Sequence, residues 1–394
     1  MSSVRFENAY IPYGAYWSSP FVRWQGSFAS LHPVHFAADI ARRALAERGI
    51  DPKQIGAVHA GTTVPSRHVF YGAPWLAGLL GAEGATGPTI TQACATSARV
   101  IAGAAAEVDS DGGGVVLGIT LDRTSNGPHV YYPDPTGPGG KGESEDWVWD
   151  NFSFDPWARN AMIETAENVA AEDGIGREEQ DECTLIRYDQ YRKAAERGFF
   201  ARYMVAPIEV KKGEVGGDEG IFPTSAEGLA RLKPVREGGT VTFGSQTHPA
   251  DGNAGMLVAT REHARQLERG RLTVQLLSYG QARAKKGFMA QATVPAARAA
   301  LEAAGLRISG VAAIKTHNPF AVNDVYFSRQ MDVPVESFNN NGSSLVFGHP
   351  QGPTGMRLVI ELIEELAERG GGIGLFTGCA AGDTAAAIVL KVEG

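Results

Sequence analysis

Three residues carry most of the chemistry that this sequence could perform: Cys94, His349 and Cys379. A cysteine thiolate is a nucleophile, and an imidazole has a pKa suited to accepting the thiol proton near neutral pH. Cys94 follows the apolar residues 88–90 and precedes a run of small residues. This pattern predicts a short strand, a tight turn and then a buried helix whose first turn carries the thiol.

A helix start should favour the thiolate form of Cys94, because unpaired backbone N–H groups and the positive end of the helix dipole face it. We therefore expect Cys94 to be a nucleophile. The alternative is a buried structural cysteine, which is common in globular proteins.

An internal repeat links Cys94 to His349. The helical segment 44–50 is matched 256 residues later by segment 300–306, and each is followed at the same distance by an apolar strand. Nearly the same offset carries Cys94 onto His349. Two similar α/β halves would then pack about a pseudo-twofold axis, where equivalent helix starts meet. The repeat therefore predicts a cysteine–histidine pair, and a histidine that only caps a turn is the alternative.

Two more residues extend the candidate site. Cys379 follows the strand 374–377 in a turn of small residues, where free backbone N–H groups could bind an oxyanion. His317 follows the apolar strand 311–314, and polar residues at such strand ends face the crevice of a doubly wound sheet. A bystander thiol and a solvated loop histidine are the alternatives. Asp251 could orient a helix start, and Cys183 is expected only to pack.

Strands alternate with helices outside the middle of the chain. Apolar spacing predicts helices at 34–50 and 73–80, and continuous apolar runs predict buried strands at 55–61 and 113–119. This alternation indicates an α/β fold with a mostly parallel sheet.

The middle of the chain, about 123–238, is interpreted as an insertion that forms a lid or pocket wall. Residues 126–145 are rich in glycine and proline and indicate an irregular loop, whereas 161–171 and 178–198 indicate amphipathic helices. Between them lie aromatic residues that could contact a substrate or form a local core: Trp147, Trp149, Phe152, Phe154 and Trp157. Regular structure is expected to resume at 239–243, followed by a loop at 244–255.

Composition narrows the possible functions. The 394 residues allow two or three domains, and the net charge of -8 without a basic run argues against nucleic acid or an anionic membrane as a partner. We expect neither a membrane span nor a signal peptide, and the three cysteines have no metal-binding spacing, so a cytoplasmic protein without a metal is expected. Sequence patterns of NTPases, nicotinamide enzymes, serine hydrolases and zincins are missing.

With these residues in place, the chain resembles the thiolase family over nearly its whole length. The matching motifs are 92–97, 348–350 and 378–382, and segments 162–167 and 176–181 are similar to the family's loop domain. The resemblance implies a duplicated fold of two halves with mixed sheets in a layered αβαβα arrangement. The expected N-terminal half comprises residues 1–124 and 238–268, the loop domain 125–237, and the C-terminal half 269–394.

The resemblance also implies a mechanism. His349 would activate Cys94, which attacks the carbonyl of a 3-oxoacyl-CoA, and Cys379 would protonate the enolate released by carbon–carbon cleavage. Coenzyme A would then take the acyl group; the reverse direction is a Claisen condensation. One oxyanion hole would use His317 with a water, and the other the backbone N–H groups of Cys94 and Ala381. Coenzyme A is implied as a substrate, with no permanently bound cofactor.

The sequence departs from the family around the expected pocket. Segment 317–320, His-Asn-Pro-Phe, stands where typical thiolases have Asn-Glu-Ala-Phe, and its histidine is similar to that of sterol-carrier-protein-type thiolases. Thr247 replaces a serine that contacts pantetheine, Phe222 replaces an arginine near the adenine, and Ala161 replaces a histidine. The expected substrate-binding residues are Thr247, Met162, Phe320 and Phe222. The aromatic residues at 147–157 favour a bulky or aromatic acyl group, such as a benzoylsuccinyl-CoA type.

Two other functions stay open. The chain could be a biosynthetic condensing thiolase in a complex with a small zinc-ribbon/OB-fold protein, as are some thiolases with a histidine at the position of His317. It could also be a non-catalytic scaffold, although the presence of Cys94, His349 and Cys379 together argues against that. Cys379 also argues against a ketosynthase, which uses two histidines with one cysteine. The family further implies a homodimer or tetramer.

Overall fold

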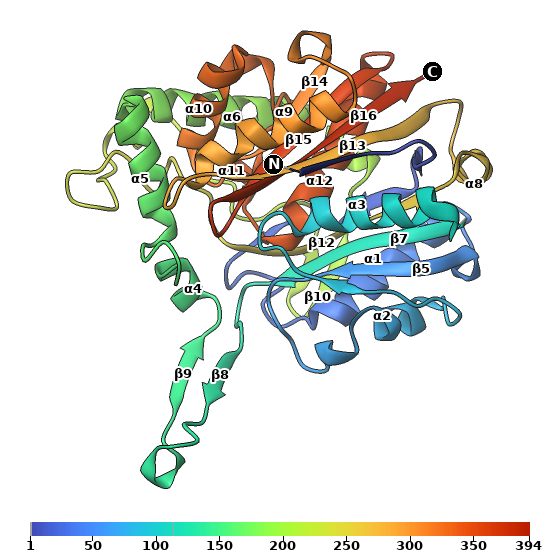
Figure 1. Cartoon of the computed structure of the whole chain (residues 1–394), viewed down its shortest axis with the longest axis horizontal. Helices are drawn as coiled ribbons and strands as arrows, with labels where there is room; N and C mark the ends of the chain where they lie inside the picture. Colours follow the sequence, from blue (N-terminus) through green and yellow to red (C-terminus); the bar gives the residue numbers. More distant parts are fainter. Residues whose placement is uncertain (1, 113) are drawn as a thin grey trace.

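A computed structural model of the chain describes residues 2–112 and 114–394 (Figure 1). Its N-terminal half contains a four-stranded arrangement in the order β6-β5-β7-β12, in which β5 runs parallel to β6 and β7 and β12 runs antiparallel to β7. The bounds are β5 Ile55–Gly61, β6 Thr89–Ile90, β7 Val115–Arg123 and β12 Ala250–Ala259.

The C-terminal half has the order β14-β15-β16-β13, in which β14, β15 and β16 repeat β5, β7 and β12. Here β14 and β15 are parallel, and β16 is antiparallel to both of its neighbours. The bounds are β13 Thr273–Arg283, β14 Ala313–His317, β15 Gly372–Ala380 and β16 Thr384–Glu393. Strand β2 (Tyr10–Pro12) pairs with both β12 and β13, so backbone hydrogen bonds join the two halves into one continuous sheet.

Two equivalent helices lie between the halves and form the central layer. They are α3 (Thr96–Glu107) and α12 (Gly352–Glu368), which pack on each other and on strands of both halves. Every residue of α12 from Gly352 to Leu366 is buried, as expected for a helix covered on both sides. Outer helices cover the other faces: α1 (Pro33–Glu47) and α2 (Gly72–Leu80) on one half, and α9 (Thr293–Ala303) and α10 (Ala321–Met331) on the other.

The predicted repeat is therefore present: α1 corresponds to α9, β5 to β14, and α3 to α12. Helix α1 ends beside Gly49, which has a φ of 67° and supplies the left-handed residue expected after a helix end. The predicted α/β class with mixed strands and layered helices is confirmed. The mostly parallel sheet expected from the alternation of strands and helices is wrong, because most strand pairings in the large sheet are antiparallel. No helix among the described residues is long and apolar enough to cross a membrane.

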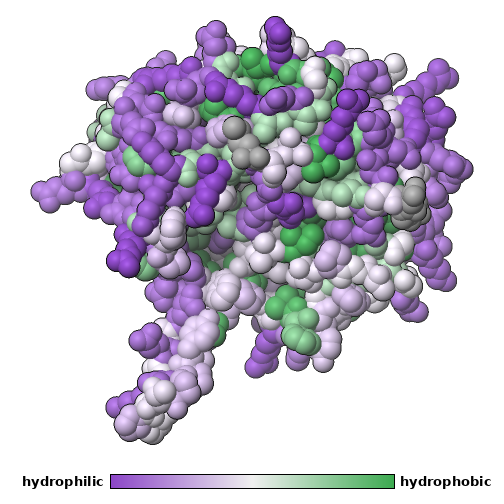
Figure 2. Space-filling model, in the orientation of Figure 1, coloured by the Kyte–Doolittle hydropathy of each residue, from purple (hydrophilic) through white to green (hydrophobic). Residues whose placement is uncertain are grey.

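The segment between β7 and β12 differs from the prediction in two places. Residues 126–145 are not an irregular loop throughout, because β8 (His129–Tyr132) and β9 (Glu143–Asp146) form an antiparallel hairpin. This hairpin projects from the body of the protein, and its surface is mostly hydrophilic to neutral (Figures 1 and 2). A second hairpin joins β10 (Ile208–Val210) to β11 (Gly213–Val215). Residues 239–243 form no strand; instead β12 begins at Ala250, inside the expected loop.

The remaining elements connect or cover these parts. Short strands line the sheet near the N-terminus, and helices joined by irregular segments form the rest of the region between β7 and β12. Their bounds are β1 Ser2–Arg5, β3 Tyr16–Ser18, β4 Val22–Arg23, α4 Trp149–Ser153, α5 Met162–Asp173, α6 Arg177–Glu196, α7 Ala226–Ala230, α8 Arg261–Leu267 and α11 Ser344–Phe347.

Candidate active site

A strained turn places Cys94 just before α3. The preceding residue, Ala93, has a φ of 45°, a left-handed conformation that a residue with a side chain rarely adopts. Thr96 holds the turn, because its hydroxyl donates to Ala93 O (2.7 Å) and accepts from the backbone N–H of Gln92 (2.8 Å). Cys94 is thus fixed at the helix start that the sequence predicted.

His349 occupies the equivalent place before α12. Its backbone N–H donates to His248 O (2.9 Å), and its carbonyl accepts from Ala250 N–H (3.3 Å). Gly348 is required beside it: its φ is 88°, and a β-carbon there would lie 2.5 Å from the His248 ring. These contacts hold His349, which precedes α12, against the start of β12.

The two helix starts bring the predicted pair into contact. His349 Nε2 lies 3.1 Å from Cys94 Sγ, and His349 Nδ1 lies 2.7 Å from the Thr354 hydroxyl. If the thiol donates to Nε2, the neutral imidazole carries its proton on Nδ1 and donates it to Thr354. The imidazole is therefore oriented as a base toward the sulfur.

The parallel strands β14 and β15 supply the other two residues. His317 ends β14 opposite Gly378 of β15. Cys379, the next residue, lies within β15 and not in a turn after the strand, as the sequence had predicted, because it pairs with Ala385 of β16. The His317 ring packs on the His349 ring with centroids 4.1 Å apart. The sulfur of Cys94 and one ring nitrogen from each of His317 and His349 all lie within 4.8 Å of one another. Cys379 Sγ accepts from Asn323 Nδ2 at 3.2 Å. All four predicted catalytic side chains therefore converge.

Burial controls the protonation of these groups. It raises the pKa of the Cys94 thiol to about 12, although the backbone N–H groups of Ala381 and Cys94 act in the opposite direction. Burial also lowers the pKa of His317 to about 3, and burial with the neighbouring His317 lowers the pKa of His349 well below 6.5. The pKa of Cys379 is raised well above 9.0 by burial and by Cys94.

Burial therefore opposes the expected thiolate form of Cys94. The helix start does direct backbone N–H groups at Cys94, but the loss of water around the sulfur outweighs them. These pKa directions favour neutral thiols and neutral imidazoles in the resting centre. A proton must move from Cys94 to His349 as the sulfur attacks, rather than before.

Asp122 is a site residue that the sequence analysis missed. It lies near the end of β7, 230 residues before Gly352, and its Oδ2 accepts the Gly352 N–H at the start of α12 (2.8 Å). Its Oδ1 accepts the backbone N–H groups of Thr63 (2.8 Å) and Val64 (3.1 Å). The role proposed for Asp251 thus belongs to Asp122, since Asp251 accepts instead from Ser125 N–H. The position of Asp122 near the end of a strand could have indicated this role from the sequence alone.

A cavity of about 890 Å³ opens onto Cys94 and His349. All four predicted substrate-binding residues line it, as does Ala381, and none of the described residues in its wall is Asp, Glu, Lys or Arg. The Thr247 hydroxyl donates to Ser344 O (2.5 Å), so in this arrangement it can only accept a hydrogen bond from a ligand. The apolar part of the wall includes Trp149, Phe152, Met162, Phe222, Leu229, Leu232, Phe243, Met289 and Phe320.

The aromatic residues at 147–157 divide into two groups. Trp149 and Phe152 line the cavity. Trp147 instead donates its indole N–H to Thr63 O (2.9 Å). The Trp157 ring makes cation–π contacts with Arg283 and Lys286. Only part of this cluster can therefore contact a ligand. Cys183 is buried in a hydrophobic cluster, as expected for a packing residue.

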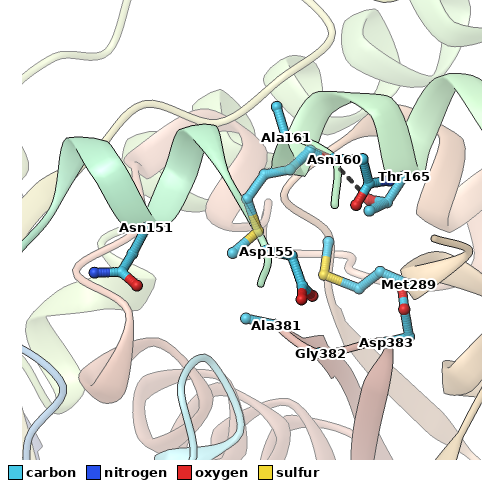
Figure 3. A pocket seen from close by; sticks show the side chains of 10 residues that line it. Asn151, Asp155, Asn160, Ala161, Thr165, Met289, Ala381, Gly382 and Asp383 are labelled. Atoms are coloured by element: carbon cyan, nitrogen blue, oxygen red, sulfur yellow. Dashed lines mark hydrogen bonds between the residues drawn. The ribbon is translucent and has the colours of Figure 1, made fainter. Parts of the chain in front are cut away.

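A small niche adjoins the main cavity and shares Ala161, Met162, Met289 and Ala381 with it. Figure 3 shows Asp155, Met289 and Ala381 around this niche. Its volume is about 10 Å³, which is about the size of one water molecule. The niche therefore marks the end of the space available near Ala381.

Comparison with known proteins agrees with this geometry. Residues 16–262 match the thiolase N-terminal domain, and residues 271–392 match the thiolase C-terminal domain. The chain belongs to the thiolase family. It is 30% identical over 390 residues to the acetyl-CoA acetyltransferase of Paracoccus denitrificans (95% of this chain, 97% of that protein). It is 28% identical over 383 residues to the human mitochondrial 3-ketoacyl-CoA thiolase (95% and 96%).

A solved thiolase structure shows the same likeness. The human mitochondrial 3-ketoacyl-CoA thiolase in complex with CoA has a TM-score of 0.89 and 26% identity, and 98% of each chain is covered. The predicted family, fold and acyltransferase class of this thiolase are confirmed. The roles of its individual site residues stay predictions.

Proposed function

We propose that this thiolase cleaves a 3-oxoacyl-CoA with coenzyme A through an acyl-Cys94 intermediate, or runs the reverse condensation. The observation that supports this most is the 3.1 Å contact between Cys94 Sγ and His349 Nε2 at the wall of a large uncharged cavity. A scaffold would have no need to hold a thiol against a correctly oriented imidazole.

The chemistry follows from the positions of the protons. As a 3-oxoacyl thioester enters, the Cys94 proton moves to His349 Nε2 and the sulfur bonds to the C3 carbonyl carbon. The alkoxide that forms then collapses, the C2–C3 bond breaks, and Cys379 gives its proton to the enolate carbon. The acetyl-CoA-type product then leaves. The coenzyme A thiol gives its proton to the Cys379 thiolate and attacks the acyl-Cys94 carbonyl. The shortened acyl-CoA is released, and the Cys94 thiolate takes its proton back from His349.

We infer that the acyl group is bulky or aromatic. The cavity wall carries Trp149, Phe152, Phe243 and Phe320, and no charged side chain among the described residues. Aromatic side chains bind flat apolar groups through large contact areas and preferred ring geometries.

The test is a thiolysis assay that compares acetoacetyl-CoA with an aryl 3-oxoacyl-CoA. We expect kcat/KM to be larger for the aryl substrate, and Trp149→Ala to reduce that preference. Cys94→Ala should abolish cleavage, whereas Cys183→Ala, which removes a thiol outside the site, should retain it. A higher kcat/KM for acetoacetyl-CoA would contradict the acyl-group proposal, and full activity of Cys94→Ala would contradict the mechanism.

We further infer that the protein is an oligomer in a reducing compartment. Phe70 and Tyr71 are 92% and 65% exposed, and large exposed aromatics are enriched at protein interfaces. The three cysteines are all free. Light scattering would give the oligomeric state. A complex with a small zinc-ribbon/OB-fold protein, suggested by His317, is the alternative, and purification from the native cell with its partners would reveal it.

A further inference from the structure

The two thiols of the catalytic centre have different partners. Cys94 Sγ lies 3.1 Å from His349 Nε2, a ring nitrogen that can take its proton. Cys379 Sγ lies instead 3.2 Å from Asn323 Nδ2, an amide nitrogen that can only donate. In the described part of the chain, no other side chain makes a hydrogen bond to Cys379. This environment suits a sulfur that carries a negative charge during part of the reaction.

Asn323 is held firmly in the first turn of α10. Its backbone N–H donates to Phe320 O (3.0 Å), the residue that precedes the helix. The next residue, Asp324, is paired with Arg187 at 2.7 Å, and both of these side chains are fully buried. Asn323 is itself only 2% exposed. The amide therefore has little freedom to move away from the sulfur.

A thiolate of Cys379 needs such a donor. Burial raises the pKa of Cys379 well above 9.0, Cys94 raises it further, and the strongest opposing effect is the hydrogen bond from Asn323. The carboxylate of Asp324 also disfavours a negative sulfur, although Arg187 balances its charge. A thiolate can only accept hydrogen bonds, so the Nδ2 end of the amide is the end that can pair with it.

We propose that Asn323 is a positioning residue that stabilises the Cys379 thiolate through its Nδ2–H donor, so that this thiol can act as the acid of carbon–carbon cleavage. The inference deepens the proposed function and rests on it. During cleavage the S–H bond of Cys379 breaks, and the proton bonds to C2 of the enolate. The electron pair stays on the sulfur, where Asn323 donates to it. The coenzyme A thiol later returns a proton to the same sulfur.

The neighbours of the two thiols thus match two different tasks. His349 can accept the proton of Cys94 while that sulfur attacks a carbonyl carbon. An amide is not a base near neutral pH, so Asn323 leaves the proton of Cys379 in place until the enolate forms. Asn323 is also absent from the wall of the main cavity, so it should affect turnover more than substrate binding.

Kinetics of Asn323→Leu test the role, because leucine has a similar size but no donor. We expect kcat for 3-oxoacyl-CoA cleavage to fall about 10-fold or more with KM changed less than about twofold, since a hydrogen bond to an ion typically stabilises it by at least that factor. The matched control is Val322→Ala, which loses packing in the cluster that contains Cys379 but keeps the amide. Its kcat should stay within about twofold of the wild type. An unchanged kcat in Asn323→Leu, or equal losses in both variants, would refute the proposal.

Alkylation by iodoacetamide measures the acidity of Cys379 directly, with Cys94→Ala as the background. Only the thiolate reacts, so below the pKa the rate follows the thiolate fraction. We expect Asn323→Leu to slow alkylation of Cys379 by about threefold or more, because a tenfold smaller thiolate fraction is partly offset by the greater nucleophilicity of a more basic sulfur.

Mass spectrometry of the labelled peptides separates Cys379 from Cys183. Cys183 belongs to the same buried cluster, so its rate reports any general loosening and should not change. Equal rates at Cys379 with and without Asn323→Leu would overturn the proposal. If the wild type cleaves no 3-oxoacyl-CoA, the proposed function fails, while the alkylation rates still decide whether Asn323 stabilises the thiolate.

Discussion

The protonation of Cys94 gives the sharpest test of the site, because two physical effects there oppose each other. The helix start and its backbone N–H groups favour a thiolate, whereas burial raises the pKa of the thiol to about 12. At about pH 9 a group with this pKa is ionised in only about one molecule in a thousand. An ordinary exposed cysteine would be mostly ionised at the same pH.

The perturbation is a pH titration of the wild type and of Cys94→Ala in the absence of substrate. Thiolates absorb in the ultraviolet where thiols do not, so the absorbance difference between the two proteins reports this single group. We expect no increment between about pH 6 and pH 9, where a pKa of about 12 leaves the thiol protonated. A full increment completed below about pH 8 would show that the backbone N–H groups outweigh burial, and the reasoning would fail.

Two further predictions concern stability. Asp122→Asn should lower the free energy of unfolding by about 1–3 kcal/mol, because its amide nitrogen would face the Gly352 N–H and leave that donor unpaired; thermal unfolding measures this, and the exposed Asp39→Asn should change little. His317→Asn should shift acid unfolding to lower pH. The folded pKa of His317 is about 3, so between about pH 6.5 and pH 3 the unfolded state takes up the proton and stability falls by up to about 1.4 kcal/mol per pH unit. An acid midpoint unchanged from the wild type, or equally shifted by the exposed His129→Asn, would contradict this.

The projecting hairpin shows why parts of the fold escaped prediction. Residues 126–145 contain many glycines and prolines, which usually indicate irregular loops. Within them, His129–Tyr132 pairs with Glu143–Asp146. Strands this short have almost no periodic pattern, so pairing with a partner strand defines them more than their own residues do. The shift of β12 into the expected loop has a similar cause, since its residues 250–255 are small and its pairing with β7 decides their conformation.

The sequence by itself determined the architecture and the identities of the reacting groups. The repeat between segments 44–50 and 300–306 placed Cys94 opposite His349, because equivalent elements of two similar halves must meet at their common axis. The types and order of Cys94, His317, His349 and Cys379 identified thiol and imidazole chemistry. Local patterns and symmetry are properties of the chain, and they could therefore be inferred from it alone.

Only the tertiary structure decided the charge state and orientation of those groups. The pKa of a thiol or an imidazole depends on how completely other parts of the chain exclude water, and no local pattern records that. The support from Asp122 to the start of α12 spans 230 residues, and the contact of Asn323 with Cys379 spans 56. These contacts arise where strands and helices from distant segments meet, so they set the direction of each proton only once the fold has formed.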